Sequence, residues 1–81
     1  MDSILTADRT IDITADLCPM TFVKTRMALD RLSVGQTLLV RLRGAEPLLN
    51  VPRTAREQGH QELDRREDED GSTLLLLRKG G

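Results

Sequence analysis

Hydrophobic residues recur with two different spacings along this chain. Residues 10–15 alternate, with Ile11 and Ile13 on one side of the backbone, and this alternation predicts a half-buried strand. Residues 19–32 follow a helical period, which predicts a helix that begins at Pro19, because the first helical N–H needs no partner within the helix. The expected core face of this helix consists of Phe22, Thr25, Ala28, Leu29 and Leu32.

The remainder of the chain divides into apolar runs separated by turn signals. It predicts strands at 37–42, 60–67 and 72–79, a loop at 43–47, a turn at 68–71 and a helix at 48–59. We expect this second helix to begin near Pro52 or slightly before it, with Pro52 in its N-terminal turn, and to end at Gly59. Four consecutive leucines at 74–77 predict a last strand that is buried on both faces.

These elements define the fold class. Their order, β-α-β-α-β-β, predicts an α+β two-layer sandwich in which a four-stranded mixed sheet carries two helices on one face. The opening β-α-β unit implies two parallel strands joined by a right-handed crossover. We expect one domain over residues 10–81, preceded by a flexible segment over residues 1–9. Because so small a domain buries only about 60% of the surface of its unfolded chain, we expect shallow sites and partner surfaces rather than a deep cavity.

Composition argues against several kinds of function. The chain has 12 basic and 13 acidic residues, a net charge of −1 and a single aromatic residue, Phe22. Neither a phosphate-binding surface nor a base-stacking platform is therefore predicted. No apolar run is long enough to span a bilayer, the first residues lack the pattern of a signal peptide, and one cysteine cannot form an internal disulfide. We expect a cytoplasmic, monomeric protein that binds neither membranes nor nucleic acid directly.

The single cysteine, Cys18, is directly followed by the predicted start of the first helix. Unpaired N–H groups and the helix dipole would stabilise a thiolate there, which predicts a lowered thiol pKa. The carboxylate of Asp16 would oppose this effect if it lay close. The alternative is a small buried side chain without reactivity, as many free cysteines are. The position of Cys18 leaves both interpretations open.

Few reactions can be built around one cysteine in this chain. His60 is the only histidine, and although the sequence allows it to contact Cys18, no glycine-rich oxyanion loop supports a Cys-His hydrolase. One cysteine and one histidine are too few for a metal site, and a redox disulfide needs a second cysteine. We expect no metal and no cofactor. What remains is an exposed sulfur that accepts a group from one protein and passes it to another.

An ordered set of motifs resembles the TusA-type, or SirA-like, family of sulfur carriers. The matching segments are Cys18-Pro19-Met20-Thr21, Ala28-Leu29 with Leu32 and Gly35, residues 37–40, Glu46-Pro47, Asn50-Val51-Pro52, Gly59-His60 and residues 77–81. Together they span nearly all of residues 10–81. Thr21 departs from the family pattern, because it replaces the second proline of the Cys-Pro-x-Pro motif. Ala45-Glu46 also departs, because the family often has paired aspartates there.

The resemblance implies a β-α-β-α-β-β sandwich that carries sulfane sulfur as a persulfide on Cys18. It implies a cysteine desulfurase or a rhodanese as donor. The acceptor would be a protein of tRNA thiolation, molybdenum-cofactor maturation or sulfur oxidation. Such a protein is a transfer partner more than a stand-alone enzyme. Pro19 and Thr21 belong to the motif at the helix start, and the change at Thr21 leaves the partner open, including a regulatory role.

A second stripe of the first helix has two interpretations. Met20, Val23 and Met27 lie away from the expected core face. They either pack under a loop or form an exposed docking patch, in which flexible methionines suit more than one partner. Lys24 and Arg31 lie near this stripe. We predict that these two cations attract acidic partner surfaces.

Two alternative functions rest on different features. A C-terminal Gly80-Gly81 pair also occurs in ubiquitin-like carriers that load sulfur as a thiocarboxylate, although those proteins open with a hairpin where this chain has one strand. A non-enzymatic regulatory or interaction module with an inert Cys18 is the other alternative. Fast, pH-dependent alkylation of Cys18 in the native protein would argue against it.

Overall fold

The six predicted elements are present in the expected order. The computed structural model describes residues 7–16 and 20–80. Its elements are β1 (Arg9–Asp12), α1 (Met20–Asp30), β2 (Thr37–Leu42), α2 (Ala45–Glu57), β3 (Gln61–Glu67) and β4 (Thr73–Arg78). This confirms the predicted order β-α-β-α-β-β.

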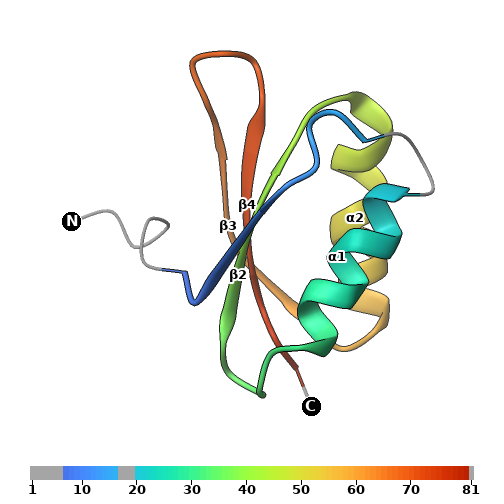
Figure 1. Ribbon diagram of the computed structural model, residues 1–81, viewed down its shortest axis with the longest axis vertical. Coiled ribbons are helices and arrows are strands. Elements are labelled where there is room, and N and C mark those ends of the chain that lie inside the picture. Colours follow the sequence, from blue (N-terminus) through green and yellow to red (C-terminus); the bar gives the residue numbers. More distant parts are fainter. Residues whose placement is uncertain (1–6, 17–19, 81) are drawn as a thin grey trace.

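The four strands form one mixed sheet. Its strand order is β1-β2-β4-β3, with β1 parallel to β2 and with β4 antiparallel to both β2 and β3. Figure 1 shows α1 and α2 together on one side of the sheet. The predicted α+β two-layer sandwich is therefore confirmed, including the parallel pair that α1 connects.

The main core lies between the sheet and the two helices. Alternate residues of the inner strands face the helices and are fully buried, namely Leu38, Val40, Leu42, Leu75 and Leu77. The helices contribute Ala28, Leu29, Val51 and Ala55 to the same cluster. Phe22 and Leu32 pack against this cluster but are only half-buried. The predicted core face of α1 is thus correct, with Phe22 and Leu32 at its margins.

The opposite face of the sheet also buries leucines. Leu39 and Leu76 form a second cluster there, and Leu74 packs beside them. Because Leu75 and Leu77 belong to the main core, the leucine run of β4 is buried on both faces, as predicted.

Arg41 of β2 ties the β3–β4 hairpin to the rest of the sheet. Its guanidinium forms ion pairs with Asp12 of β1 and with Asp68 and Asp70 of the hairpin turn. Ser72 donates hydrogen bonds to Asp70 from its hydroxyl and its backbone N–H, and these bonds, with the nearby Arg41, lower the pKa of Asp70 to about 2. Two acidic residues of the turn, Asp68 and Asp70, therefore have a structural role, because they pair with Arg41 of β2.

The second helix begins earlier than predicted. The expected loop at 43–47 is wrong, because α2 starts at Ala45. Gly44 turns the chain with a φ of 106°, and its carbonyl accepts a hydrogen bond from the Leu48 N–H at 3.2 Å. Pro47 is tolerated because it lies in the first turn, where its missing N–H would have no partner in the helix.

Pro52 lies inside α2, so its predicted place in the N-terminal turn is wrong. Its missing N–H leaves the helix without one backbone hydrogen bond. The ring is less than 2% exposed, beside the buried Val51. Burial against the core thus outweighs the local preference of proline for a helix start.

Four other elements differ from prediction at their ends, β3 (Gln61–Glu67) by one residue at its start and β4 (Thr73–Arg78) by one residue at each end. The strand expected at 10–15 is Arg9–Asp12, because the chain turns after it and the Asp16 N–H donates a hydrogen bond to the Ile13 carbonyl. The helix expected at 19–32 ends at Asp30. Residues 1–6 of the segment expected to be flexible lie outside the described residues. Of the helices in the described ranges, none has the length and apolar character to cross a membrane.

Candidate functional site

The chain approaches the cysteine through a hydrogen-bonded turn. Thr14 donates to the Asp12 carboxylate from its N–H at 2.9 Å and from its hydroxyl at 2.7 Å. These two bonds lower the pKa of Asp12, because they favour its charged form. The Asp16 N–H donates to the carbonyl of the buried Ile13 at 3.1 Å. The turn therefore holds the chain in place as far as Asp16.

Cys18 and Pro19, with Leu17, lie outside the described residues. The covalent chain nevertheless limits where the thiol can act. Cys18 precedes Met20, the first residue of α1, by two positions, and two peptide units span at most about 8 Å between Cα atoms. The candidate site is therefore the region around the amino end of α1. Unpaired N–H groups and the helix dipole favour negative charge in this region.

Thr21, the motif residue that replaces a proline, is the second residue of α1 and is buried. Its exposed fraction is 1%. Its carbonyl accepts a hydrogen bond from the Thr25 hydroxyl at 2.8 Å, but its own hydroxyl has no hydrogen-bond partner among the described residues. Thr21 is thus accommodated in the first helical turn with an unpaired polar atom in the protein interior.

An ion pair joins the turn before the cysteine to α1. The Lys24 Nζ atom lies 2.7 Å from the Asp16 Oδ1 atom, and the Asp16 side chain is only 20% exposed. This pair compensates the charge of the Asp16 carboxylate, which would oppose a thiolate at Cys18 if it lay close. The sequence did not predict the contact, because these residues are eight positions apart and belong to different local structures.

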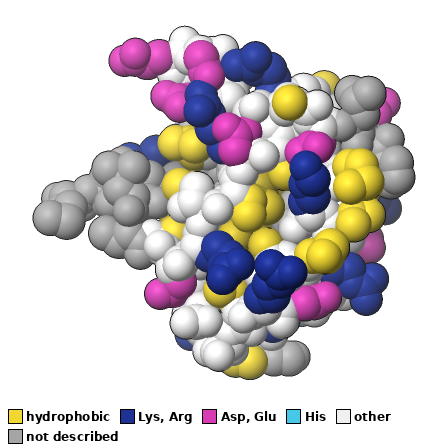
Figure 2. All heavy atoms as spheres, viewed as in Figure 1, with side chains coloured by type: hydrophobic (Ala, Val, Ile, Leu, Met, Phe, Trp, Pro, Cys, Tyr) yellow, Lys and Arg dark blue, Asp and Glu magenta, His cyan; other side chains and the backbone are white. Residues whose placement is uncertain are grey.

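The residues predicted to bind partners lie together on the outer side of α1 and directly after it. Met20, Val23 and Met27 have exposed fractions of 45%, 41% and 51%, and Figure 2 shows hydrophobic side chains gathered over this helix. Packing under a loop, the alternative interpretation of these three residues, is therefore wrong. Lys24 and Arg31 are also exposed. We call these five residues the α1 patch.

His60 lies near the opposite end of α1 from the cysteine. It lines a surface hollow with Asp30 and Lys79, and α1, with its 11 residues, is about 16 Å long. The His60 Nδ1 atom accepts a hydrogen bond from the Gly80 N–H at 3.0 Å. Burial, together with the charge of Lys79, lowers the pKa of His60. His60 therefore serves as a structural residue just before β3.

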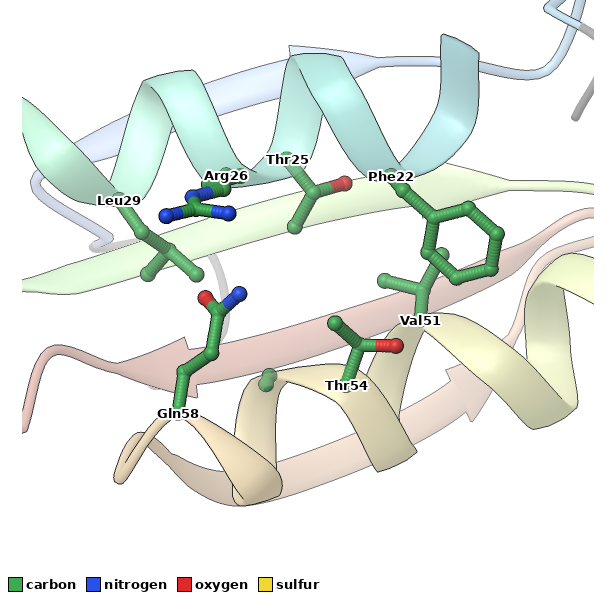
Figure 3. Close-up of a pocket in the computed structure, with 8 residues that line it drawn as sticks. Phe22, Thr25, Arg26, Leu29, Val51, Thr54 and Gln58 are labelled. Carbon is green, nitrogen blue, oxygen red and sulfur yellow. The ribbon is translucent and has the colours of Figure 1, made fainter. Parts of the chain in front are cut away.

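The space between the two helices is too small for a substrate. Figure 3 shows Phe22, Thr25 and Leu29 of α1 facing Val51 and Thr54 of α2 across it. The cavity measures about 10 Å³, roughly the space that one water molecule needs. Within residues 7–16 and 20–80, no group of three or more His, Cys, Asp or Glu side chains could hold a metal ion.

The fold and the site together define a class of protein. It is a small two-layer domain whose single cysteine is two positions before the first helix in the sequence, and that helix carries an exposed and partly basic patch. The family model of the sulfurtransferase TusA matches residues 9–79. The chain therefore belongs to the TusA family and has the role of a TusA-like sulfur carrier or sulfurtransferase, which implies interaction with sulfur donor and acceptor proteins.

Two individual proteins are similar to the chain. A protein of Archaeoglobus fulgidus, named "Putative sulfur carrier protein", is 27% identical over 73 residues, which are 90% of this chain and 83% of that protein. The crystal structure of a SirA-like protein from Desulfitobacterium hafniense has a TM-score of 0.79 at 23% identity, over 90% of this chain and 99% of that one. The second similarity concerns the fold alone.

Proposed function

We propose that Cys18 accepts sulfane sulfur as a persulfide and relays it to an acceptor protein. A cysteine desulfurase or a rhodanese would supply the sulfur. The outlet would be tRNA thiolation, molybdenum-cofactor maturation or sulfur oxidation. The protein would act in the cytoplasm, as a monomer without metal or cofactor. Membership of the TusA family supports this proposal.

The proposed transfer needs little from the carrier besides a nucleophilic thiolate. The Cys18 thiolate attacks the outer sulfur of the donor persulfide, a new S–S bond forms, and the donor leaves as its own thiolate. No oxidant or reductant is required, because each transfer replaces one S–S bond by another and the sulfur keeps its oxidation state. The acceptor thiolate then attacks the outer sulfur on Cys18 in the same way. The amino end of α1 favours the thiolate, and the pairing of Asp16 with Lys24 removes an opposing charge.

The observation that carries the proposal is the exposed apolar surface beside the cysteine motif. Met20, which directly follows the Cys18-Pro19 pair, is 45% exposed, and Val23 continues this surface one turn further along α1. Grouped, exposed apolar side chains are typical of protein-binding surfaces. A donor or acceptor docked on the α1 patch would hold its reactive sulfur near Cys18.

Transfer of radiolabelled sulfur from a cysteine desulfurase tests the proposal. We expect label on the wild-type protein and none on Cys18→Ser. Val23→Glu should slow the transfer at least about tenfold, because it buries a charge in the docking surface. Leu49→Glu is the matched control, because Leu49 is an exposed apolar residue of the other helix. Equal labelling of wild type and Cys18→Ser would refute the proposal.

The packing of Gly80 argues against the alternative function, in which the chain would carry sulfur as a C-terminal thiocarboxylate. The Gly80 N–H donates to His60 Nδ1, and a Cβ atom built on Gly80 would lie 1.7 Å from the Gly59 carbonyl oxygen. Gly80 is thus packed against the fold, whereas a thiocarboxylate carrier needs a free tail. An interaction module with an inert Cys18 stays an alternative, and the absence of sulfur on the wild-type protein would favour it.

A further inference from the structure

A groove runs between α1 and the edge strand β1. Its volume is about 370 Å³, and it is open to solvent. The apolar part of its wall is formed by Ile11 of β1, by Ile13 just after this strand, and by Met27 and Ala28 of α1. Three cations also line it, namely Arg9, Lys24 and Arg31. The groove thus combines an apolar floor with a basic rim.

Two of these cations lack a compensating charge. Within the described residues, neither Arg9 nor Arg31 forms an ion pair, although both are exposed on the same groove. Lys24 is neutralised by Asp16. Asp12, the acidic residue of the groove, already accepts hydrogen bonds from Thr14 and belongs to the Arg41 network. In a chain with a net charge of −1, this surplus of positive charge is local.

The strand beside the groove is an edge strand of the sheet that the described residues form. β1 is the first strand in the order β1-β2-β4-β3, and in the described part of the chain it pairs only with β2. Its outer backbone N–H and C=O groups can therefore accept another strand. The other edge strand, β3, is less suitable, because its register is broken between Glu62 and Asp64 and most of its side chains are charged.

We propose that an acidic, extended segment of a partner protein binds this groove by adding a strand to the outer edge of β1. Its backbone would pair with residues 9–12, and alternate side chains would point toward α1. Acidic side chains would meet Arg9 and Arg31, and an apolar one would cover Met27. The inference deepens the proposed function, because it names the kind of segment by which a donor or acceptor is held.

Binding of a synthetic peptide tests this inference independently of sulfur transfer. The probe is a capped six-residue peptide, Glu-Thr-Val-Thr-Glu-Thr, whose alternate side chains Glu, Val and Glu share one face. It is added to the isotope-labelled full chain and followed by amide chemical shifts. We expect shifts at residues 9–13 and at Met27 and Arg31. Arg9→Glu with Arg31→Glu should weaken binding at least about tenfold at low salt, since two attractive pairs become repulsive. Arg53→Glu, on the exposed side of α2, should leave the affinity within about twofold.

Backbone pairing is tested by N-methylation of alternate peptide residues. Methylation of the N–H groups that face β1 should abolish binding, whereas methylation of the other set should preserve it. Equal effects of the two methylated sets, equal binding of the same peptide with Lys in place of both Glu residues, or shifts centred on another surface would overturn the inference. Cys18→Ser should bind the peptide as wild type does, because the groove does not need the thiol. Loss of peptide binding would therefore contradict the groove proposal alone, and loss of sulfur loading would contradict the proposed role of Cys18 alone.

Discussion

Thr21 and Thr25 should respond in opposite directions to the same substitution. Both threonines lie in α1 and are buried, with exposed fractions of 1% and 4%. The Thr25 hydroxyl donates to the Thr21 carbonyl at 2.8 Å. The Thr21 hydroxyl has no hydrogen-bond partner within the described part of the chain. Because valine keeps the branched shape of threonine, replacement by valine tests each hydroxyl with little change in packing.

The expected change in the free energy of unfolding depends on whether the threonine hydroxyl is hydrogen-bonded. A buried hydroxyl without a partner costs about 1–3 kcal/mol, so Thr21→Val should raise the free energy of unfolding by about 1 kcal/mol. Thr25→Val removes a hydrogen bond that is formed, and it should lower the free energy of unfolding by about 1 kcal/mol. The two variants should therefore differ by about 2 kcal/mol.

Thermal unfolding followed by circular dichroism measures this difference. In a domain of this size, 1 kcal/mol changes the melting temperature by about 4–8 °C, so the two variants should melt on opposite sides of wild type. Urea denaturation gives the free energies directly. A Thr21→Val variant less stable than wild type would show that its hydroxyl is paired in solution. Equal shifts of both variants in one direction would refute the reasoning.

Three further predictions concern pH, close packing and charge. Because the folded-state pKa of His60 is lowered from 6.5, the unfolded chain binds the proton first, and stability measured by urea denaturation should fall as the pH drops below about 6.5. His60→Asn, which keeps an acceptor for the Gly80 N–H, should flatten this dependence, and an unchanged slope would contradict the assignment. Gly80→Ala should lower the free energy of unfolding by about 1–2 kcal/mol, because the added Cβ meets backbone atoms, and unaltered urea stability would contradict this. Lys24→Ala should raise the thiol pKa of Cys18 and Asp16→Asn should lower it, as measured by alkylation rate against pH; the reverse order would refute the role of the ion pair.

The fold could be predicted because hydrophobic periodicity and turn residues agree along most of the chain. The alternation around Ile11 and the leucine run of β4 both correspond to strands with the expected buried faces. The start of α2 could not be predicted, because Pro47 and Pro52 are both acceptable in a first helical turn. Only the core, in which Pro52 is buried, decides between them.

The candidate site was harder to predict from the sequence than the fold, because its main contacts join residues that are far apart in the chain. The Lys24–Asp16 pair joins residues eight positions apart, and the His60–Gly80 hydrogen bond joins residues 20 positions apart. The exposure of Met27 depends on which side of α1 faces the sheet, and periodicity left two interpretations of that stripe. The grouping of Arg9 with Arg31 on one groove could not be predicted, because it depends on how β1 lies beside α1.

Mass spectrometry of the sulfur-loaded protein tests the central claim most directly. After incubation with a cysteine desulfurase and cysteine, the account predicts a gain of about 32 Da, which corresponds to one sulfur atom on Cys18. This gain should map to the peptide that contains Cys18, and it should be absent from Cys18→Ser. A gain of about 16 Da at the C-terminus that survives in Cys18→Ser, as expected when sulfur replaces an oxygen atom, would contradict the account.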